Sequence, residues 1–548
     1  MMLRLLWLVV SLWCVAPRAE EEEVLMGVVF EEKKALFLRR YEGYGYPNRF
    51  ESPVAYEAFV NSEVGGRLKG DAYLDYAGSA LYTNSQVDAF AEDLKSHVYG
   101  NPHSLSSSAT RSTEAVESAR EEILSFLGAS SDQYEVIFTR SCTDSLRLVA
   151  DAFPWSSDSK FKYLLQNHNS VLGIREVARA RGAQAKAVSA AEIEAWLESA
   201  SEEDHGRSLF AYPGEENFAG EMFPLGWAKK IVEARDDADN PLSRWSVLID
   251  GAKFLATHPI NLTETPVDFL TMSFYKLFGS PTGVGALVTL RKTAEDLTKC
   301  YFGGGSVTVA GAGRLEADDL HVLKSRICER FEDGTVSFLG IAELKHGFKV
   351  LNSLGGPLAI EKHTKALASY LDDRLRALEH VNNKPVVVVY GPENHNNGGP
   401  VVNFNVIDAQ GHLLSHIQVM EEAARAGIHI RAGAECNPGA AYEYLGVSPD
   451  AVHDLATNDN YLGCGTGPAF ITCQRKDLTK QSFLVSEVDF ASDPGGSVLC
   501  EPNLDFVMPP EDIQVPLGSL RASLGYLSTF QDVDTLANFI DTNYRRKI

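Results

Sequence analysis

The sequence has few cysteines for its length, and they are spread along the chain rather than paired. Only eight occur among 548 residues, with no CxxC pair and no spacing typical of metal ligands. They are Cys14, Cys142, Cys300, Cys328, Cys436, Cys464, Cys473 and Cys500. This scatter argues against a zinc site and against a disulfide framework, so we predict no metal centre. A single reactive thiol remains compatible with the pattern.

Positive charge is also in short supply. The chain has 50 basic against 74 acidic residues, a net charge of −24, and a surface of that sign repels phosphate backbones. Nucleic acid is therefore not an expected partner. The hydrophobic content of 45% is ordinary for a globular enzyme, and 548 residues can bury a large core in more than one domain.

Long apolar runs are missing except near the start. A short basic start is followed by an apolar run from Leu5 to Ala16 and then by an acid cluster. The run is too short to span a bilayer comfortably, and the small residues Ala16 and Ala19 suit a cleavage site. We predict a signal or targeting leader over residues 1–19, which implies an ER-routed or organellar protein that is soluble once mature. A misassigned start or a buried apolar helix, with a cytoplasmic location, is the alternative.

Three buried strands are predicted between Trp245 and Leu290, and polar groups follow the first two. The first strand ends in Asp250, and the second, Val267 to Met272, leads directly into Ser273-Phe274-Tyr275-Lys276. Short apolar runs of this kind are typical of central parallel strands, whose carboxyl ends hold the ligand groups of α/β proteins. An acid and a lysine therefore reach the same edge of the sheet.

This pair of residues has a chemical use. A lysine can form a Schiff base with an aldehyde cofactor, and pyridoxal phosphate also needs a carboxylate that keeps its ring nitrogen protonated. Asp250 and Lys276 match these two roles. The alternative is a solvated loop lysine with no cofactor, and this stretch alone does not decide between the two.

A strand-to-helix junction supplies a candidate anion site. The strand from Glu135 to Thr139 turns into a helix that is predicted to start near Asp144. Free backbone N–H groups and the positive end of the helix then point out of the strand edge, at Cys142 and Thr143. A plain helix cap without a ligand is the alternative.

Two further strand ends carry polar residues. His168 follows a strand from Tyr163 to Gln166, and Asn217 follows a strand from Leu209 to Tyr212. A lone histidine at a strand end is more often structural, and an asparagine in such a loop is often a turn former. Strands and helices alternate from about 134 to 290, which predicts an α/β fold with a mostly parallel, doubly wound sheet.

Taken in order, the motifs resemble one family. SFYKLFGSPTGVGAL with DGAK upstream, and YLDYAG and YGNPHS earlier in the chain, resemble the molybdenum cofactor sulfurases, relatives of the cysteine desulfurases in the class V aminotransferase group. The resemblance covers about residues 73–540. It implies fold type I of the pyridoxal phosphate-dependent transferases, which is aspartate aminotransferase-like, with a smaller α+β C-terminal domain.

The resemblance implies roles for several residues around pyridoxal phosphate. His168 would stack on the pyridine ring, and Asn217 would donate to the phenolic oxygen. The phosphate would be bound by Cys142, Thr143 and Ser273, although an alanine is more usual in place of Cys142.

The glycine-rich loop from Tyr301 to Val309 implies a partner subunit. A lone glycine-rich run is by itself a weak phosphate signal. In related desulfurases, however, a residue of this loop reaches the phosphate of the neighbouring subunit. Ser306 therefore predicts a homodimer.

Cys436 is the predicted nucleophile. It lies in a Gly/Pro loop that can expose a thiol, and sulfurases have a persulfide-forming cysteine in a similar R-x-G-x-x-C-N-P-G-A run. Relatives often carry further cysteines where this chain has Ala434 and Ala441. Arg521, in an R-x-S-x-G run, would clamp the carboxylate of the substrate with its guanidinium fork, and Arg431 is the second candidate.

We predict four parts and one insertion. Residues 1–19 form the leader, 20–95 an N-terminal segment, 96–334 the large cofactor domain and 335–548 the small domain. The small domain includes a long helix from near Ser337, a strand from Val401 to Val406 and a helix from His412 to Ala426. A stretch over about 446–513 has little periodicity and is interpreted as an insertion. The C-terminal domain with which sulfurases commonly hold the acceptor would be absent.

The sequence thus predicts a pyridoxal phosphate-dependent cysteine desulfurase of the molybdenum cofactor sulfurase type. L-cysteine would be the sulfur donor, Cys436 would carry a persulfide, and the molybdenum cofactor or a protein would be the acceptor. The alternatives are another class V enzyme, such as a general cysteine desulfurase, a selenocysteine lyase or a C–N lyase. A binding protein or scaffold that keeps the fold without catalysis is a further alternative.

Overall fold

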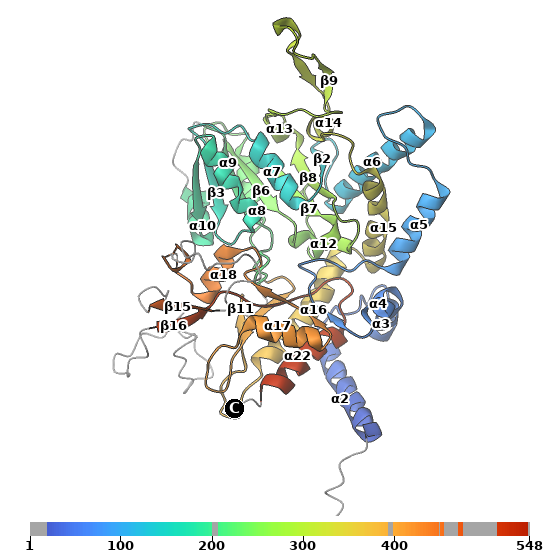
Figure 1. Ribbon diagram of the computed structural model, residues 1–548, viewed down its shortest axis with the longest axis vertical. Coiled ribbons are helices and arrows are strands. Elements are labelled where there is room, and N and C mark those ends of the chain that lie inside the picture. The colour runs from blue at the N-terminus through green and yellow to red at the C-terminus, as the bar shows by residue number, and fades with distance from the viewer. Residues whose placement is uncertain are drawn as a thin grey trace, which may run out of the picture.

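The computed structural model describes residues 19–199, 206–392, 398–448, 450–453, 470–474 and 512–545. The predicted leader, apart from Ala19, and most of the predicted insertion over 446–513 lie outside the described residues. Figure 1 shows two parts, one built around a large sheet and the other around a smaller sheet. Across the described ranges, no helix is long and apolar enough to cross a membrane.

The large part is organised by a seven-stranded sheet with the order β2-β8-β7-β6-β5-β3-β4. Strands β3 to β7 pair in parallel, whereas β8 is antiparallel to both β7 and β2. The strands are β2 (Tyr134–Thr139), β3 (Lys160–Leu164), β4 (Gln184–Val188), β5 (Ser208–Pro213), β6 (Trp245–Asp250), β7 (Phe269–Ser273) and β8 (Gly285–Leu290). The predicted mostly parallel sheet is confirmed.

Strand β8 is the antiparallel strand of this mostly parallel sheet. Strand β7 ends at Ser273 and β8 begins at Gly285, and between them lie one short helix, α12 (Phe274–Phe278), and a turn. A parallel crossover needs a dozen or more residues. The connection is too short for that, so the chain returns antiparallel.

Helices cover both faces of the large sheet, because its strands alternate between two hydrophobic clusters. In β6, Val247 and Ile249 face one cluster and Leu248 faces the other, which is the period of two expected for a strand buried on both sides. Helices α6 (Ser107–Phe126), α10 (Ala190–Ser199), α11 (Gly226–Ala234) and α15 (Phe338–Leu354) contribute to the first cluster. Helices α7 (Cys142–Ala152), α9 (Ile174–Ala180) and α14 (Ile327–Phe331) contribute to the second. The short helices α8 (Asn169–Leu172) and α13 (Arg291–Ala294) connect strands of this part.

The small part contains a four-stranded antiparallel sheet with the order β11-β12-β17-β14. Its elements are β11 (Val387–Tyr390), β12 (Val401–Val406), β14 (Arg431–Gly433), β17 (Ser519–Ser523), α16 (Pro357–Arg376), α17 (His416–Arg425), α18 (Pro438–Leu445) and α22 (Phe530–Tyr544). Strand β12 has the predicted bounds. Helix α17 begins four residues later than predicted, because Ser415 caps it by accepting a hydrogen bond from the Gln418 N–H. A separate two-stranded sheet pairs β15 (Phe470–Gln474) with β16 (Asp512–Pro516).

The N-terminal segment packs against the small part. Strand β1 (Ala72–Tyr73) pairs in parallel with β13 (Ile428–His429). The Tyr46 hydroxyl donates to the carbonyl of Tyr526 at 2.7 Å. The other helices of the segment are α2 (Ala19–Arg40), α3 (Pro53–Val60), η1 (Asn61–Gly65), α4 (Gly66–Leu68) and α5 (Asn84–Ser96). The two ends of the chain therefore share one core.

A hairpin projects from the large part at the top of Figure 1, and we call residues 301–323 the arm. It consists of β9 (Val307–Ala310) paired antiparallel with β10 (His321–Leu323). The predicted glycine loop over 301–309 therefore runs into a strand. The Ser306 side chain is buried, and its hydroxyl donates to the Gly303 carbonyl at 2.9 Å and to the Asp333 carboxylate at 2.8 Å.

Candidate active site

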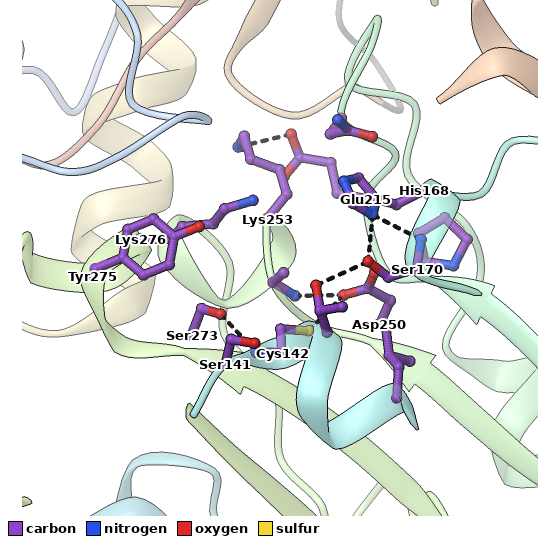
Figure 2. Close-up of a pocket in the computed structure, with 15 residues that line it drawn as sticks. Ser141, Cys142, His168, Ser170, Glu215, Asp250, Lys253, Ser273, Tyr275 and Lys276 are labelled. Carbon is purple, nitrogen blue, oxygen red and sulfur yellow. Dashed lines mark hydrogen bonds and ion pairs between the residues drawn. The ribbon is translucent and has the colours of Figure 1, made fainter. Parts of the chain in front are cut away.

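Asp250 and Lys276 line the same pocket, at the carboxyl edge of the large sheet (Figure 2). Asp250 is the last residue of β6, and Lys276 lies on α12, three residues beyond the end of β7. The pocket encloses about 580 Å³, including the part that is open to solvent. The carboxylate and the amine thus meet where the sheet edge places them.

The surroundings of Lys276 favour its neutral amine. Burial lowers the pKa of Lys276, and Asp250 opposes this shift without cancelling it. A second lysine, Lys253, also lines the pocket, and its charge lowers the pKa of Lys276 further. Lys253 is buried, and its ammonium lies 2.9 Å from the carboxylate of Glu215. A neutral amine is the form that attacks an aldehyde.

Lys253 and Glu215 were not predicted from the sequence to belong to the site. The DGAK motif placed Lys253 three residues after Asp250, so its proximity to the pocket could have been inferred. The Glu215 carboxylate also lies 3.3 Å from the imidazole of His258. Burial of this acid is thus compensated by two cationic or polar partners.

The N-terminus of α7 faces the pocket. The helix begins at Cys142 rather than near Asp144, because Ser141 is the cap and its hydroxyl accepts a hydrogen bond from the Asp144 N–H at 3.1 Å. The Cys142 N–H donates to the Ser273 hydroxyl at 3.0 Å. The Thr143 hydroxyl is exposed and lies 2.9 Å from that of Ser170. N–H groups, hydroxyls and a helix dipole are therefore gathered at one end of the pocket, which suits an anion.

The thiol of Cys142 contacts Asp250. Its Sγ lies 3.2 Å from Asp250 Oδ1 and 2.9 Å from the hydroxyl of Thr271. Burial, and after it the charge of Asp250, raise the pKa of this thiol, so it stays protonated and can donate to the carboxylate. The sequence assigned Cys142 to the phosphate, whereas its side chain lies at the carboxylate end of the pocket. A phosphate role for its backbone stays a prediction.

His168 lines the side of the pocket away from Lys276 (Figure 2). Its Nδ1 accepts a hydrogen bond from the Ser170 N–H at 3.1 Å and caps α8. Burial lowers the pKa of His168, and Asp250 opposes the shift, so the neutral imidazole is favoured. A half-buried, neutral ring that is fixed in orientation suits stacking on an aromatic ligand.

Cys436 lies in an exposed loop that is fastened to the edge of this pocket. The loop connects β14 to α18 and is capped by Asn437, whose side chain accepts a hydrogen bond from the Ala440 N–H. The Cys436 carbonyl accepts from the Asn169 N–H at 2.8 Å, next to His168. Asn217, which lines the pocket, donates from its amide to the Glu435 carbonyl at 2.6 Å. The predicted nucleophile therefore lies on a loop that is bound to two walls of the pocket.

Arg521 lies on β17, in contact with Asn217, and is 1% exposed. Its Nη1 donates to the Asn217 carbonyl at 2.8 Å and lies 2.7 Å from the Glu435 carboxylate. Its Nη2 lies 3.1 Å from the carboxylate of Asp75. Arg431, which is half-exposed, lies 2.7 Å from the same Asp75. Neither acid was predicted from the sequence, because Asp75 lies far away along the chain and Glu435 only adjoins the cysteine.

Ser306 does not line this pocket. Its hydroxyl is bonded to the Gly303 carbonyl and to the Asp333 carboxylate. A contact between Ser306 and the phosphate of a neighbouring subunit therefore stays a prediction.

The groups that line the pocket fit a phosphorylated pyridine aldehyde. Lys276 offers an amine for the aldehyde, Asp250 a buried carboxylate for a ring nitrogen, and the start of α7 a set of donors for a phosphate. His168 offers a ring for the face of the pyridine. Among the described residues, no group of three or more histidine, cysteine or acidic side chains could hold a metal ion.

Comparison with known proteins agrees with this arrangement. The family model of aminotransferase class V matches residues 72–450. Molybdenum cofactor sulfurase of Arabidopsis thaliana is 36% identical over 543 residues, which cover 93% of this chain and 60% of that protein. The Homo sapiens sulfurase is 36% identical over 492 residues, 86% of this chain and 50% of that protein. The chain thus spans about half to three fifths of the length of these relatives.

Among solved structures, the cysteine desulfurase CsdA from Escherichia coli superposes with a TM-score of 0.62 at 19% identity. The match covers 90% of this chain and 98% of that chain. The fold is accordingly that of the pyridoxal phosphate-dependent transferases of fold type I, as predicted from the sequence. Because the family model covers more than half of the sequence, the chain belongs to the class V aminotransferase family.

Proposed function

We propose that this chain is a pyridoxal phosphate-dependent cysteine desulfurase of the molybdenum cofactor sulfurase type. The observation that carries the proposal is that Lys276, Asp250 and the loop bearing Cys436 meet at one pocket. The similarity to molybdenum cofactor sulfurases over most of the chain supports it.

Lys276 and Asp250 divide the proton chemistry between them. When bound, pyridoxal phosphate supplies an electron sink for charge that develops next to the substrate amine. Asp250 holds a proton on the ring nitrogen. The lowered pKa of Lys276 makes its Nζ a base that takes the α-proton of the substrate. The pocket thus pairs a base with a carboxylate that keeps the sink protonated.

Cys436 and Arg521 act on the two ends of the substrate. Arg521 binds the carboxylate of L-cysteine through its guanidinium. The Cys436 thiolate forms an S–S bond with the substrate sulfur as the Cβ–S bond breaks, and protonation of the carbon product gives alanine. Cys436 then holds a persulfide that an acceptor can take.

The acceptor, the compartment and the assembly are further parts of the proposal. The relatives named molybdenum cofactor sulfurase suggest that the molybdenum cofactor, or a protein that carries it, takes the sulfur. The signal-like start favours an ER-routed or organellar location, with the cytoplasm as alternative.

We also propose a homodimer that the arm helps to form. The arm exposes six large apolar residues: Tyr301 is 72%, Phe302 37%, Val309 53%, Leu315 69%, Leu320 50% and Val322 52% exposed. Such a concentration of exposed apolar side chains on a projecting hairpin is typical of a surface that a partner covers. A second copy of this chain is the proposed partner.

The experiment that tests the activity is incubation of the purified protein with L-cysteine. Wild type should release alanine and carry a persulfide, whereas Cys436→Ala should form no persulfide on this loop. If Cys436→Ala keeps most of its turnover, a lyase that releases its product directly is the better description. If the purified protein binds no pyridoxal phosphate and Lys276→Ala changes neither absorption nor turnover, the protein is a non-catalytic homologue.

A further inference from the structure

Arg521, the proposed clamp for the substrate, already binds a carboxylate of its own chain. Glu435 Oε2 lies 2.7 Å from Arg521 Nη1, and both side chains are 2% exposed. Asp75 lies 3.1 Å from Nη2, and the Asn217 carbonyl is 2.8 Å from Nη1. Within the described ranges, Nε is the nitrogen of Arg521 that lacks a partner. Nη1 and Nη2 thus each have a carboxylate partner already, so a substrate carboxylate can bind these two nitrogens as a fork only if an acid leaves.

Of these two acids, Glu435 is held less firmly. Asp75 accepts hydrogen bonds from Arg431 as well as from Arg521, at distances of 2.7 to 3.2 Å. Glu435 Oε1 is buried without a hydrogen-bond partner among the described residues. Burial also raises the pKa of Glu435, although both arginines oppose that shift, so its charge is only partly compensated.

Glu435 immediately precedes Cys436, and both residues have an unusual backbone. Their φ angles are +55° and +56°, in the left-handed region that costs an L-residue roughly 1–2 kcal/mol. Their carbonyls accept hydrogen bonds from the pocket residue Asn217 and from Asn169, next to His168. The contact of Glu435 with Arg521 therefore helps to hold the thiol loop in a strained conformation.

A second cation lies close to Glu435. Arg431 Nε is 3.9 Å from Glu435 Oε2, and its side chain is half-exposed. A carboxylate that leaves Arg521 can thus move toward Arg431 and solvent without losing its ionic partner. The arrangement of two arginines offers Glu435 one position in the core and one at the surface.

We propose that Glu435 is a positioning residue that occupies Arg521 until the carboxylate of an α-amino acid displaces it toward Arg431, which releases the Cys436 loop toward the substrate. The inference rests on the proposed function, because it takes Arg521 as the clamp and Cys436 as the nucleophile. It links arrival of the substrate to movement of the thiol, so that the loop stays fixed while no substrate carboxylate is bound.

Alkylation of Cys436 tests this link in the wild-type protein with its cofactor bound. The rate of modification by iodoacetamide is followed by peptide mapping, with glycine or methylamine added. Glycine brings a carboxylate and no sulfur, whereas methylamine brings only the amine. Glycine should raise the rate at Cys436 several-fold, methylamine should not, and the rate at the exposed Cys300 should stay constant. An unchanged rate at Cys436 with glycine bound would overturn the inference.

Two variants of Glu435 separate the link from a purely structural role. Glu435→Gln removes the charge and keeps the size, and Glu435→Ala removes both. In each variant, Cys436 should be alkylated rapidly even without glycine. The KM for L-cysteine should also be lower, by roughly tenfold if competition from the Glu435 carboxylate costs about 1.4 kcal/mol. The kcat should not rise in parallel, because the Cys436 loop is then no longer freed specifically when the substrate carboxylate binds. Glu443→Gln, an acid on α18 that bonds Gln166, is the matched control and should change neither.

Arg521→Lys distinguishes a failure of the inference from a failure of the proposed function. If this variant raises KM for L-cysteine while the Glu435 variants leave KM and alkylation unchanged, the clamp stands and the displacement is wrong. If Arg521→Lys leaves KM unchanged as well, Arg521 is not the clamp and the displacement is wrong. Persulfide formation on Cys436 then decides separately whether the proposed function stands.

Discussion

The Cys142 thiol lies 3.2 Å from the Asp250 carboxylate, in the same pocket as Lys276. A protonated thiol that donates a hydrogen bond to this carboxylate competes with any other group that donates to the same carboxylate. In the proposed enzyme that other donor is the ring nitrogen of the cofactor. The strength with which Asp250 binds the cofactor therefore depends on Cys142, at a position where an alanine is more usual.

Replacement of Cys142 by alanine should tighten the binding of pyridoxal phosphate. The lost hydrogen bond is worth about 0.5–1.5 kcal/mol, which corresponds to roughly a two- to tenfold lower dissociation constant. Equilibrium dialysis or the change in cofactor absorption measures it. Cys328→Ala, which removes a buried thiol on α14, is the control and should leave cofactor binding unchanged. Weaker binding in Cys142→Ala would contradict the competition.

The buried pair of Lys253 and Glu215 should be costly to break on one side. Lys253→Met leaves the Glu215 carboxylate buried with less compensation and should lower the free energy of unfolding by about 3–5 kcal/mol. The double variant Lys253→Met with Glu215→Gln should recover most of this loss. Urea unfolding measures both, and equal stability of the single and double variants would show that the pair is not coupled.

Acid should destabilise the junction between the two ends of the chain through His363. Its imidazole is buried, accepts from the Gly45 N–H at 3.1 Å and contacts the Ser528 carbonyl at 3.0 Å, and burial lowers its pKa to about 3. In the unfolded chain this histidine binds a proton below about pH 6.5, whereas the folded chain does not. Stability is therefore lost as the pH falls from about 6.5 toward 3, at about 1.4 kcal/mol per pH unit from this group.

The variant His363→Gln keeps a donor and an acceptor but does not titrate. Unfolding free energies at pH 7, 6 and 5 should fall less steeply in this variant than in wild type. Parallel slopes would mean that another group controls the acid sensitivity.

The arm should govern assembly without contributing to the fold of one subunit. Leu315→Glu together with Val322→Glu places two charges on exposed apolar positions, so folding should be unaffected while a dimer should dissociate. Sedimentation velocity measures the mass, and circular dichroism checks the fold. Val381→Glu changes a residue that is 85% exposed outside the arm and serves as control. A wild-type monomer, or a double variant that remains dimeric, would contradict the role of the arm.

Much of the fold could be predicted from the sequence because central strands such as β6 and β7 are short apolar runs that are buried throughout. Strand β12 has its predicted bounds, and β6 ends at Asp250, as predicted. Helix starts were less well predicted, since several polar residues near each start can act as the cap. Ser141 and Ser415 are the caps, whereas the starts were predicted near Asp144 and at His412.

The candidate site, too, could be predicted from the sequence only in part. Asp250, Lys276 and His168 follow strands, and a parallel sheet collects strand ends at one edge, so their proximity follows from topology. The contacts of Asp75 and Glu435 with Arg521 depend on how a loop and two distant segments pack, and no local pattern encodes them. Ser306 shows the reverse case, because its motif predicts a ligand role while its hydroxyl is bonded to Asp333.

The shared core of the two chain ends has a consequence for synthesis. The large sheet is built from one continuous stretch, residues 134–290, so it can form while the rest of the chain is still being translated. The tyrosines of the N-terminal segment, such as Tyr46, can instead pack only after Tyr526 has been synthesised, nearly five hundred residues later. During that interval their apolar surface is open to other proteins, and a chaperone that covers aromatic side chains would meet the nascent chain there.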